Sequence, residues 1–167
     1  LMKRVIIISD LHVGSSVSVM PSSFILEDGQ VVKPSDYQKK INEFWYKFWE
    51  FAKKGCEDFV VIVNGECVDG NHHDTTQILS PSPTIQVKNA ITLLEEVVPK
   101  NSKVFFTKGT NAHSGKGGAM DVLVANHFKS PCEYVLNLNI EGVTFNVAHH
   151  TARKIENEDR KSTRLNS

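Results

Sequence analysis

Four pairs of residues along this 167-residue chain combine side chains that bind metal ions, and each pair follows an apolar run. Carboxylate and amide oxygens together with imidazole nitrogens suit Mn, Fe, Zn or a mixed pair of these ions. A bridging carboxylate can hold two such ions about 3.5–4 Å apart. The pattern therefore predicts a two-metal hydrolytic site. The pairs are Asp10 and His12, Glu66 and Asp69, Asn111 and His113, and His149 and His150.

The apolar runs before these pairs have the character of buried strands. Residues 3–9 and 58–64 are continuous β-branched segments, typical of parallel strands that are covered on both faces. Residues 102–108 predict a third such strand. Ligand sites in open α/β sheets lie outside the carboxyl ends of the strands, so the pairs are expected to meet at one edge of the sheet.

Helical patterns separate the predicted strands. A helix is expected from the capping residue Ser35 to Gly55, and its aromatic stripe is interpreted as core. Two hairpins are expected, with turns at Asp28-Gly29 and Glu141-Gly142. The order β, α, β, α, β, α, β, β predicts an α/β fold whose sheet begins parallel and ends with a hairpin. The stripe comprises Ile41, Phe44, Trp45, Phe48 and Phe51, and the other two helices are expected over residues 84–99 and 118–128.

Four short blocks, SDLH, NGECVDG, KGTNAH and VAHH, resemble in order the first four signature blocks of the calcineurin-like metallophosphoesterases. The resemblance covers residues 3 to about 152. The third block is most similar to that of phage-type members, which often have G-T-x-x-H. The resemblance implies a metallophosphoesterase-like β-sandwich flanked by helices (αββα) around a centre of two divalent metal ions.

The resemblance also implies roles for the first two blocks. Asp10 and His12 correspond to ligands of the first metal. Glu66 stands where the family has a bridging aspartate, and its extra methylene places the carboxylate farther from the backbone. Asp69 is assigned to the catalytic machinery, where it is expected to brace its loop by hydrogen bonds.

The third and fourth blocks imply the second metal and the acid. Asn111 corresponds to a ligand of the second metal, and either His149 or His150 would complete that metal's ligands. His113 corresponds to the histidine beside the scissile phosphate, which helps to protonate the leaving oxygen. A final G-H-x-H block of the family is absent, which suggests that the carboxy-terminal part of the domain is missing.

Two further residues are candidates for substrate binding. His73 lies in the polar loop DGNHHD of residues 69–74, where a role at the site competes with simple loop structure. Lys116 lies in GKGG, which lacks the G-x-x-x-x-G-K-S/T pattern of a phosphate loop and is equally consistent with a flexible turn before a helix. Lys116 could still contact a phosphate.

Three functions are compatible with these observations. The first is a metal-dependent phosphatase or phosphodiesterase that uses a metal-activated water on a phosphoester substrate. The second is a nuclease of the same superfamily, which the balance of 19 basic and 19 acidic residues does not favour. The third is a non-catalytic relative that binds phosphate or a protein. Neither the substrate nor the oligomeric state can be inferred from the sequence.

The whole chain predicts one domain over residues 1–158. Residues 159–167 are polar and aperiodic, and are interpreted as a non-native or disordered tail. No window has the 18 or more apolar residues expected of a membrane span, and no signal peptide is recognisable, so the default expectation is a cytoplasmic location without a membrane partner. The three cysteines are expected to be packing residues.

Overall fold

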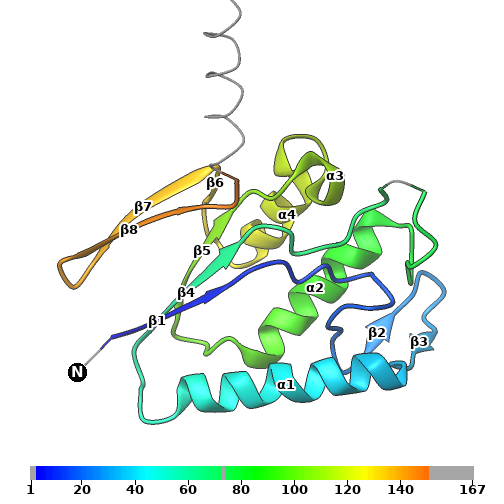
Figure 1. The fold of residues 1–167 in the computed structure, drawn as a ribbon, viewed down its shortest axis with the longest axis horizontal. Coiled ribbons are helices and arrows are strands. Elements are labelled where there is room, and N and C mark those ends of the chain that lie inside the picture. Colours follow the sequence, from blue (N-terminus) through cyan, green and yellow to red (C-terminus); the bar gives the residue numbers. More distant parts are fainter. Residues whose placement is uncertain (1–2, 73, 151–167) are drawn as a thin grey trace, which may run out of the picture.

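The computed structural model describes residues 3–72 and 74–150 of an α/β domain. Helices alternate with the first strands, and a strand hairpin ends the described part (Figure 1). The elements are β1 (Arg4–Ile8), β2 (Phe24–Ile25), β3 (Val31–Val32), α1 (Asp36–Lys53), β4 (Phe59–Asn64), α2 (Pro83–Val97), β5 (Lys103–Thr107), α3 (Asn111–Ser114), the 3-10 turn η1 (Lys116–Gly118), α4 (Ala119–His127), β6 (Cys132–Glu133), β7 (Val135–Ile140) and β8 (Val143–Ala148).

The main sheet has four parallel strands in the order β1-β4-β5-β6. The three predicted parallel strands are confirmed, and β6 is a short fourth strand that the sequence did not indicate. The register pairs Ile8 with Val63 and Asn64 with Thr107, so the carboxyl ends of β1, β4 and β5 lie level. The loops that follow these three strands therefore start from one edge.

Alternate residues of β4 enter two separate cores. Val61 and Val63 belong to the larger core, which α1, α2 and α4 complete. Val60 and Ile62 point to the opposite face, where they pack against Leu136 of the β7–β8 hairpin. Both faces of the central strand are thus buried, as its continuous β-branched sequence predicted.

The β7–β8 hairpin forms a two-stranded sheet of its own. The expectation that the hairpin would end the main sheet is therefore wrong. It lies on the other side of the β1, β4 and β5 strands from α1 (Figure 1). Its six residue pairs join Val135 to Ala148 at one end and Ile140 to Val143 at the other. In this position the hairpin removes apolar side chains of both sheets from water, which stabilises the stacking.

Helix α1 begins and ends as predicted but buries a different face. Ser35 and Gln38 form a capping box, which fixes the first turn. The fully buried aromatic residue is Trp49, whereas Phe44 is 64% exposed and Phe51 is 79% exposed. The interpretation of the whole aromatic stripe as core is therefore wrong. The helix presents a second apolar face outside the core.

The remaining expectations about the chain have mixed outcomes. The turn at Asp28-Gly29 joins β2 and β3 as predicted. Cys56, Cys67 and Cys132 form no disulfide with one another, and they pack in or against the larger core. The predicted tail and the end of the predicted domain lie outside the described residues. Within the described ranges, no helix is both long and apolar enough to cross a membrane.

Candidate metal centre

The loops after β1, β4 and β5 and the end of β8 bring together most of the predicted metal-binding residues. Asp10 and His12 follow β1, Glu66 follows β4, His113 lies in α3 after β5, and His149 follows β8. Three groups have potential ligand atoms within 4.8 Å of one another. The groups are His12, Glu66 and His113; Glu66, His149 and His150; and Asp69, His72 and His113.

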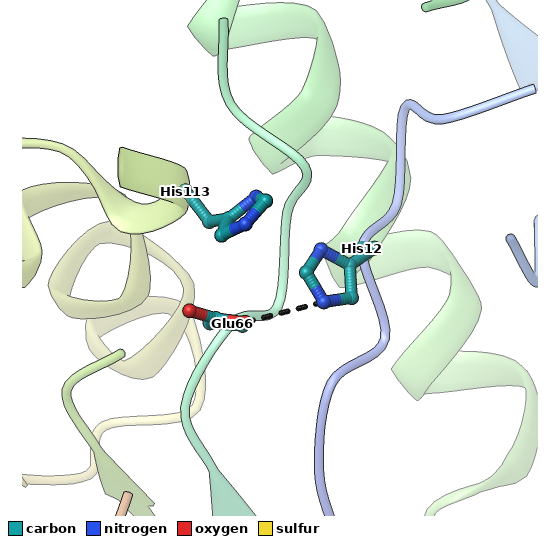
Figure 2. Close-up of side chains that lie close together, drawn as sticks. All are labelled: His12, Glu66 and His113. Atoms are coloured by element: carbon teal, nitrogen blue, oxygen red, sulfur yellow. Dashed lines mark ion pairs between the residues drawn. The ribbon is translucent and has the colours of Figure 1, made fainter. Parts of the chain in front are cut away.

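Glu66 lies at the middle of this arrangement. Its Oε2 is 3.2 Å from His12 Nε2, and its Oε1 is 3.4 Å from His149 Nε2. Figure 2 shows the rings of His12 and His113 close to the Glu66 side chain, with the ion pair between Glu66 and His12 drawn as a dashed line. The carboxylate is almost completely buried, with 6% of the side chain exposed. The two carboxylate oxygens of Glu66 therefore face imidazole nitrogens of two different histidines.

Asp10 completes the ring of ligand atoms around one side of Glu66. Its Oδ1 is 3.8 Å from His12 Nε2 and 3.9 Å from His149 Nε2. Its Oδ2 accepts a hydrogen bond from the Ser9 hydroxyl. The side chain is half exposed, so an ion or a substrate could reach it from solvent.

Asp69 connects the histidines on the other side. Its Oδ1 is 3.2 Å from His12 Nδ1, 3.5 Å from His72 Nε2 and 3.6 Å from His113 Nδ1. Its backbone carbonyl lies 2.7 Å from His113 Nδ1. These contacts with Asp69 orient the rings of His12 and His113 at once.

Acceptors on the protein fix the tautomers of three histidines. A backbone carbonyl can only accept, so His113 Nδ1 donates to Asp69 and His149 Nδ1 donates to the carbonyl of Asn64 at 2.7 Å. His12 Nδ1 likewise lies within hydrogen-bond distance of the Asp69 carboxylate. In the neutral rings the lone pair is then on Nε2. Metal-binding histidines are commonly oriented in this way by a carbonyl or carboxylate behind them.

The backbone is strained where the proposed ligands stand. Asp10, His12 and Glu66 have φ angles of 57°, 47° and 54°, in the left-handed region. Non-glycine residues in this region cost on the order of 1 kcal/mol each and persist where the surroundings hold them. Six described non-glycine residues have such angles, and three of them are in this site. The concentration of strain supports a functional rather than a structural reason for these residues.

Two glycines allow the loops to approach closely. A Cβ at Gly65 would lie 2.8 Å from the His149 ring, and a Cβ at Gly109 would lie 2.5 Å from Glu66 Cγ. Gly65 also has a φ of +74°, which favours glycine. The side chains of His149 and Glu66 occupy the space that a Cβ atom at Gly65 and Gly109 would need.

A buried carboxylate joins the second and third loops, and the sequence analysis missed it. Asp121 of α4 accepts from the Cys67 amide at 2.9 Å and from the Gly109 amide at 2.7 Å. It is completely buried. Its signal was an acidic residue in the otherwise apolar segment of residues 119–125. Asp121 holds the loop that carries Glu66 against the loop that leads to His113.

Two other polar residues support the same loops. Thr110 donates a hydrogen bond from its hydroxyl to Glu66 Oε1. Gln86 of α2 is buried, accepts from the Gly70 amide at 2.8 Å and donates to the Ser80 carbonyl at 2.8 Å. No sequence pattern identified Gln86. Glutamine is usually found at the protein surface, and the sequence alone does not show that this glutamine is buried.

The surroundings of Glu66 have opposite effects on its pKa. Burial raises the pKa, whereas the Thr110 hydrogen bond and the nearby His113, His12 and His149 lower it. The net effect is a pKa below the ordinary value. The carboxylate is thus charged at neutral pH, as a metal ligand must be.

Four predicted site residues are less closely tied to this arrangement. The Asn111 side-chain oxygen accepts from the Gly117 amide at 3.0 Å, and its role as a ligand stays a prediction. Lys116 is exposed in η1, and its contact with substrate also stays a prediction. His150 stacks edge-on against His149 with ring centroids 4.5 Å apart and is exposed. His73 lies outside the described residues.

The donor set fits divalent transition ions. Two carboxylates and two imidazole Nε2 atoms converge from Asp10, Glu66, His12 and His149. Lone pairs of neutral imidazoles facing carboxylate oxygens repel unless a cation or a proton lies between them. The chemistry of these donors suits Mn, Fe or Zn better than Ca or Mg, which prefer oxygen ligands alone.

Comparisons with known proteins do not identify a relative. The sequence matches no family model and no curated protein, and the structure matches no solved structure.

Proposed function

We propose that this chain is a metal-dependent phosphoester hydrolase, a phosphatase or phosphodiesterase, with a metallophosphoesterase-like αββα architecture. The observation that carries the proposal is the orientation of His12 and His149. Both rings have Nδ1 occupied by an acceptor and turn Nε2 toward Asp10 and Glu66. The order of the four sequence blocks and the stacking of the hairpin on the main sheet also support it.

Asp10, His12, Glu66 and His149 would hold the metal ions. Two divalent ions, when bound there, would polarise the phosphoryl group and lower the pKa of a water molecule. The protein residues would place the phosphoryl group beside these four side chains. Glu66 is anchored for this task by the Thr110 hydroxyl, and His149 by the Asn64 carbonyl.

His113 would act as the general acid. Its Nδ1 donates to the Asp69 carbonyl, and the Asp69 carboxylate lies 3.6 Å from the same nitrogen and would stabilise the imidazolium. The proton on Nε2 would then pass to the oxygen of the leaving group. Asp69 would keep the ring in place without touching the reacting atoms.

Metal content and turnover test this proposal together. The purified chain is loaded with Mn²⁺, its bound metal is measured by mass spectrometry, and hydrolysis of p-nitrophenyl phosphate and bis-p-nitrophenyl phosphate is followed. We expect about two ions per chain, turnover that chelation abolishes, and loss of both in His12→Ala. Metal binding without turnover would instead indicate a non-catalytic binder, and absence of metal binding would contradict the proposal.

His113→Ala separates the acid from the ligands. We expect it to retain metal and to lose about 10²–10⁴-fold in kcat, which is the usual contribution of a positioned acid. The loss should be smaller for bis-p-nitrophenyl phosphate than for an ester with an alkyl alcohol, because nitrophenolate leaves without help. An equal loss in kcat for both esters would contradict the assignment of His113 as the general acid.

A further inference from the structure

A pocket of about 620 Å³ extends from the metal centre along helix α1. One end is polar and is lined by Asp10, His12, Asp69 and His113. Serine, threonine and glutamine side chains also line the pocket, and six apolar side chains form an apolar wall. These are Leu11, Val17, Val19, Ile41, Phe44 and Trp45. The two ends belong to one continuous cavity, so a molecule held at the metal centre can also contact the apolar wall.

Part of the apolar wall is exposed to solvent. Phe44 is 64% exposed and Val17 is 45% exposed, although both line the pocket. Pockets for small molecules commonly have about 300–1,000 Å³ and combine apolar walls with a few polar groups at one place. A phosphoryl group alone would occupy only the polar end. The rest of the volume has room for an organic group, and burying that group would remove apolar surface from water.

The charge of the lining restricts what this organic group can be. Among the described residues that line the pocket there is no lysine or arginine. The ionisable side chains are Asp10, Asp69 and three histidines, and all belong to the polar end. A second phosphate or a carboxylate on the substrate would therefore lose its hydration without gaining a cationic partner. The wall favours an organic group without charge.

We propose that the apolar wall formed by Ile41, Phe44 and Trp45 binds the organic group of the substrate, and that the substrate is a phosphoester with one phosphoryl group on an uncharged aromatic or branched apolar group. This inference rests on the proposed function of the adjacent metal centre, because the phosphoryl group must be held at the polar end. It adds the substrate class, and it disfavours polyanions such as nucleic acid.

Binding of non-hydrolysable phosphonates tests the wall without turnover. Calorimetry with the Mn²⁺-loaded chain compares benzylphosphonate with methylphosphonate, which differ only in the phenyl ring. We expect benzylphosphonate to bind about tenfold or more tightly, because even one methylene in an apolar pocket can give a tenfold preference. A third probe, 4-carboxybenzylphosphonate, should lose most of this preference because of its added charge.

A matched pair of variants on α1 locates the effect. Phe44→Ala should reduce the preference for benzylphosphonate about tenfold and leave methylphosphonate unchanged. Phe51→Ala removes another exposed aromatic ring from the same helix, but Phe51 lines a different pocket. It should bind all three probes like the parent chain. Because both rings are exposed, neither change should affect folding.

The outcomes distinguish this inference from the proposed function. If both simple phosphonates bind only with Mn²⁺ and with equal affinity, or if Phe44→Ala has no effect, the substrate class is overturned and the metal centre stands. Equal affinity for the carboxylated probe would overturn the requirement for an uncharged group. If no phosphonate binds with Mn²⁺, the proposed function fails and the inference fails with it.

Discussion

The polar and apolar ends of the pocket are held in place in different ways. At the polar end, the proposed metal-binding residues lie on loops and have left-handed backbone angles. Buried residues such as Asp121 and Gln86 hold these loops together through hydrogen bonds. At the apolar end, Ile41, Phe44 and Trp45 project from a regular helix. A single substitution at the polar end should therefore disturb several residues of the site, whereas one at the apolar end should disturb only its own contacts.

The difference shows where precision is needed. A metal centre requires several atoms within tenths of an ångström of their positions, and only loops fixed by neighbours can supply them from four separate segments. An apolar wall needs only shape and area. We expect substitutions at the polar end to affect stability and metal binding together, and substitutions at the apolar end to affect only the ligand.

Asp121→Ala should produce the largest effect. It leaves the buried amides of Cys67 and Gly109 without an acceptor, and each orphaned group costs about 1–3 kcal/mol. The free energy of unfolding, measured by urea denaturation, should fall by a few kcal/mol, and bound Mn²⁺ should decrease with it. Asp121→Asn keeps one acceptor and should lie between. Unchanged stability in Asp121→Ala would show that the two loops are held independently.

Glu66→Gln should have the next largest effect, on the metal centre itself. The amide keeps the shape of the side chain and can still accept from Thr110, but it loses the negative charge. Mutation of a residue that only hydrogen-bonds to a metal ligand can lower metal affinity by ~100-fold, so loss of a ligand's charge should lower Mn²⁺ affinity by at least as much. Titration calorimetry measures this change. Glu50→Gln on the exposed side of α1 is the control, and it should bind Mn²⁺ normally. Equal affinity in both variants would exclude Glu66 as a ligand.

Thr110→Val should have a smaller effect that depends on pH. The pKa of Glu66 lies below its ordinary value of 4.5, so the charged carboxylate stabilises the folded chain above that value, and the contribution is lost as the pH falls through the lowered pKa. Without the Thr110 hydroxyl the metal-free chain should lose about 1 kcal/mol at neutral pH and less under acid.

The measurement is urea denaturation of the metal-free chain at pH 7 and near pH 4. Thr92→Val is the control, since the Thr92 hydroxyl donates to the Lys88 carbonyl within α2. It should show no pH-dependent difference from the parent chain. A loss of stability in Thr110→Val that grows as the pH falls would contradict the assigned direction.

Phe44→Ala should have the smallest effect on the fold. The ring is largely exposed, so the free energy of unfolding should change by less than about 0.5 kcal/mol. Trp49 on the same helix is buried, and Trp49→Ala should cost about 3–5 kcal/mol. Similar losses in the two variants, measured by denaturation, would show that Phe44 belongs to the core after all.

The strands and long helices could be predicted because their signals are local. Continuous β-branched runs indicated β1 and β4, a short apolar run indicated β5, and capping by Ser35 indicated the start of α1. The buried face of α1 could not be predicted from its sequence, because two sets of residues follow helical spacing. The first set is residues 41, 44, 48 and 51, and the second is residues 38, 45, 49 and 52. Contacts with other elements select the second set, and the sequence of one helix does not contain them.

The identity of the site residues could be predicted from the sequence, but their arrangement in space could not. Asp10, His12, Glu66 and His149 could be named because each follows an apolar run. The roles of Asp121 and Gln86 in holding the loops together could not be predicted, since their partners are backbone amides of distant loops. The stacking of the β7–β8 hairpin also depends on a non-local choice, between the edge and the face of the main sheet.

The left-handed backbone at Asp10, His12 and Glu66 has a consequence for the order of folding. These segments have no local preference for their native conformation, so they gain nothing until β1 and β4, some 55 residues apart in sequence, have paired. We expect the loops to become ordered after the folding transition state. Substitutions in them would then accelerate unfolding and leave the folding rate nearly unchanged.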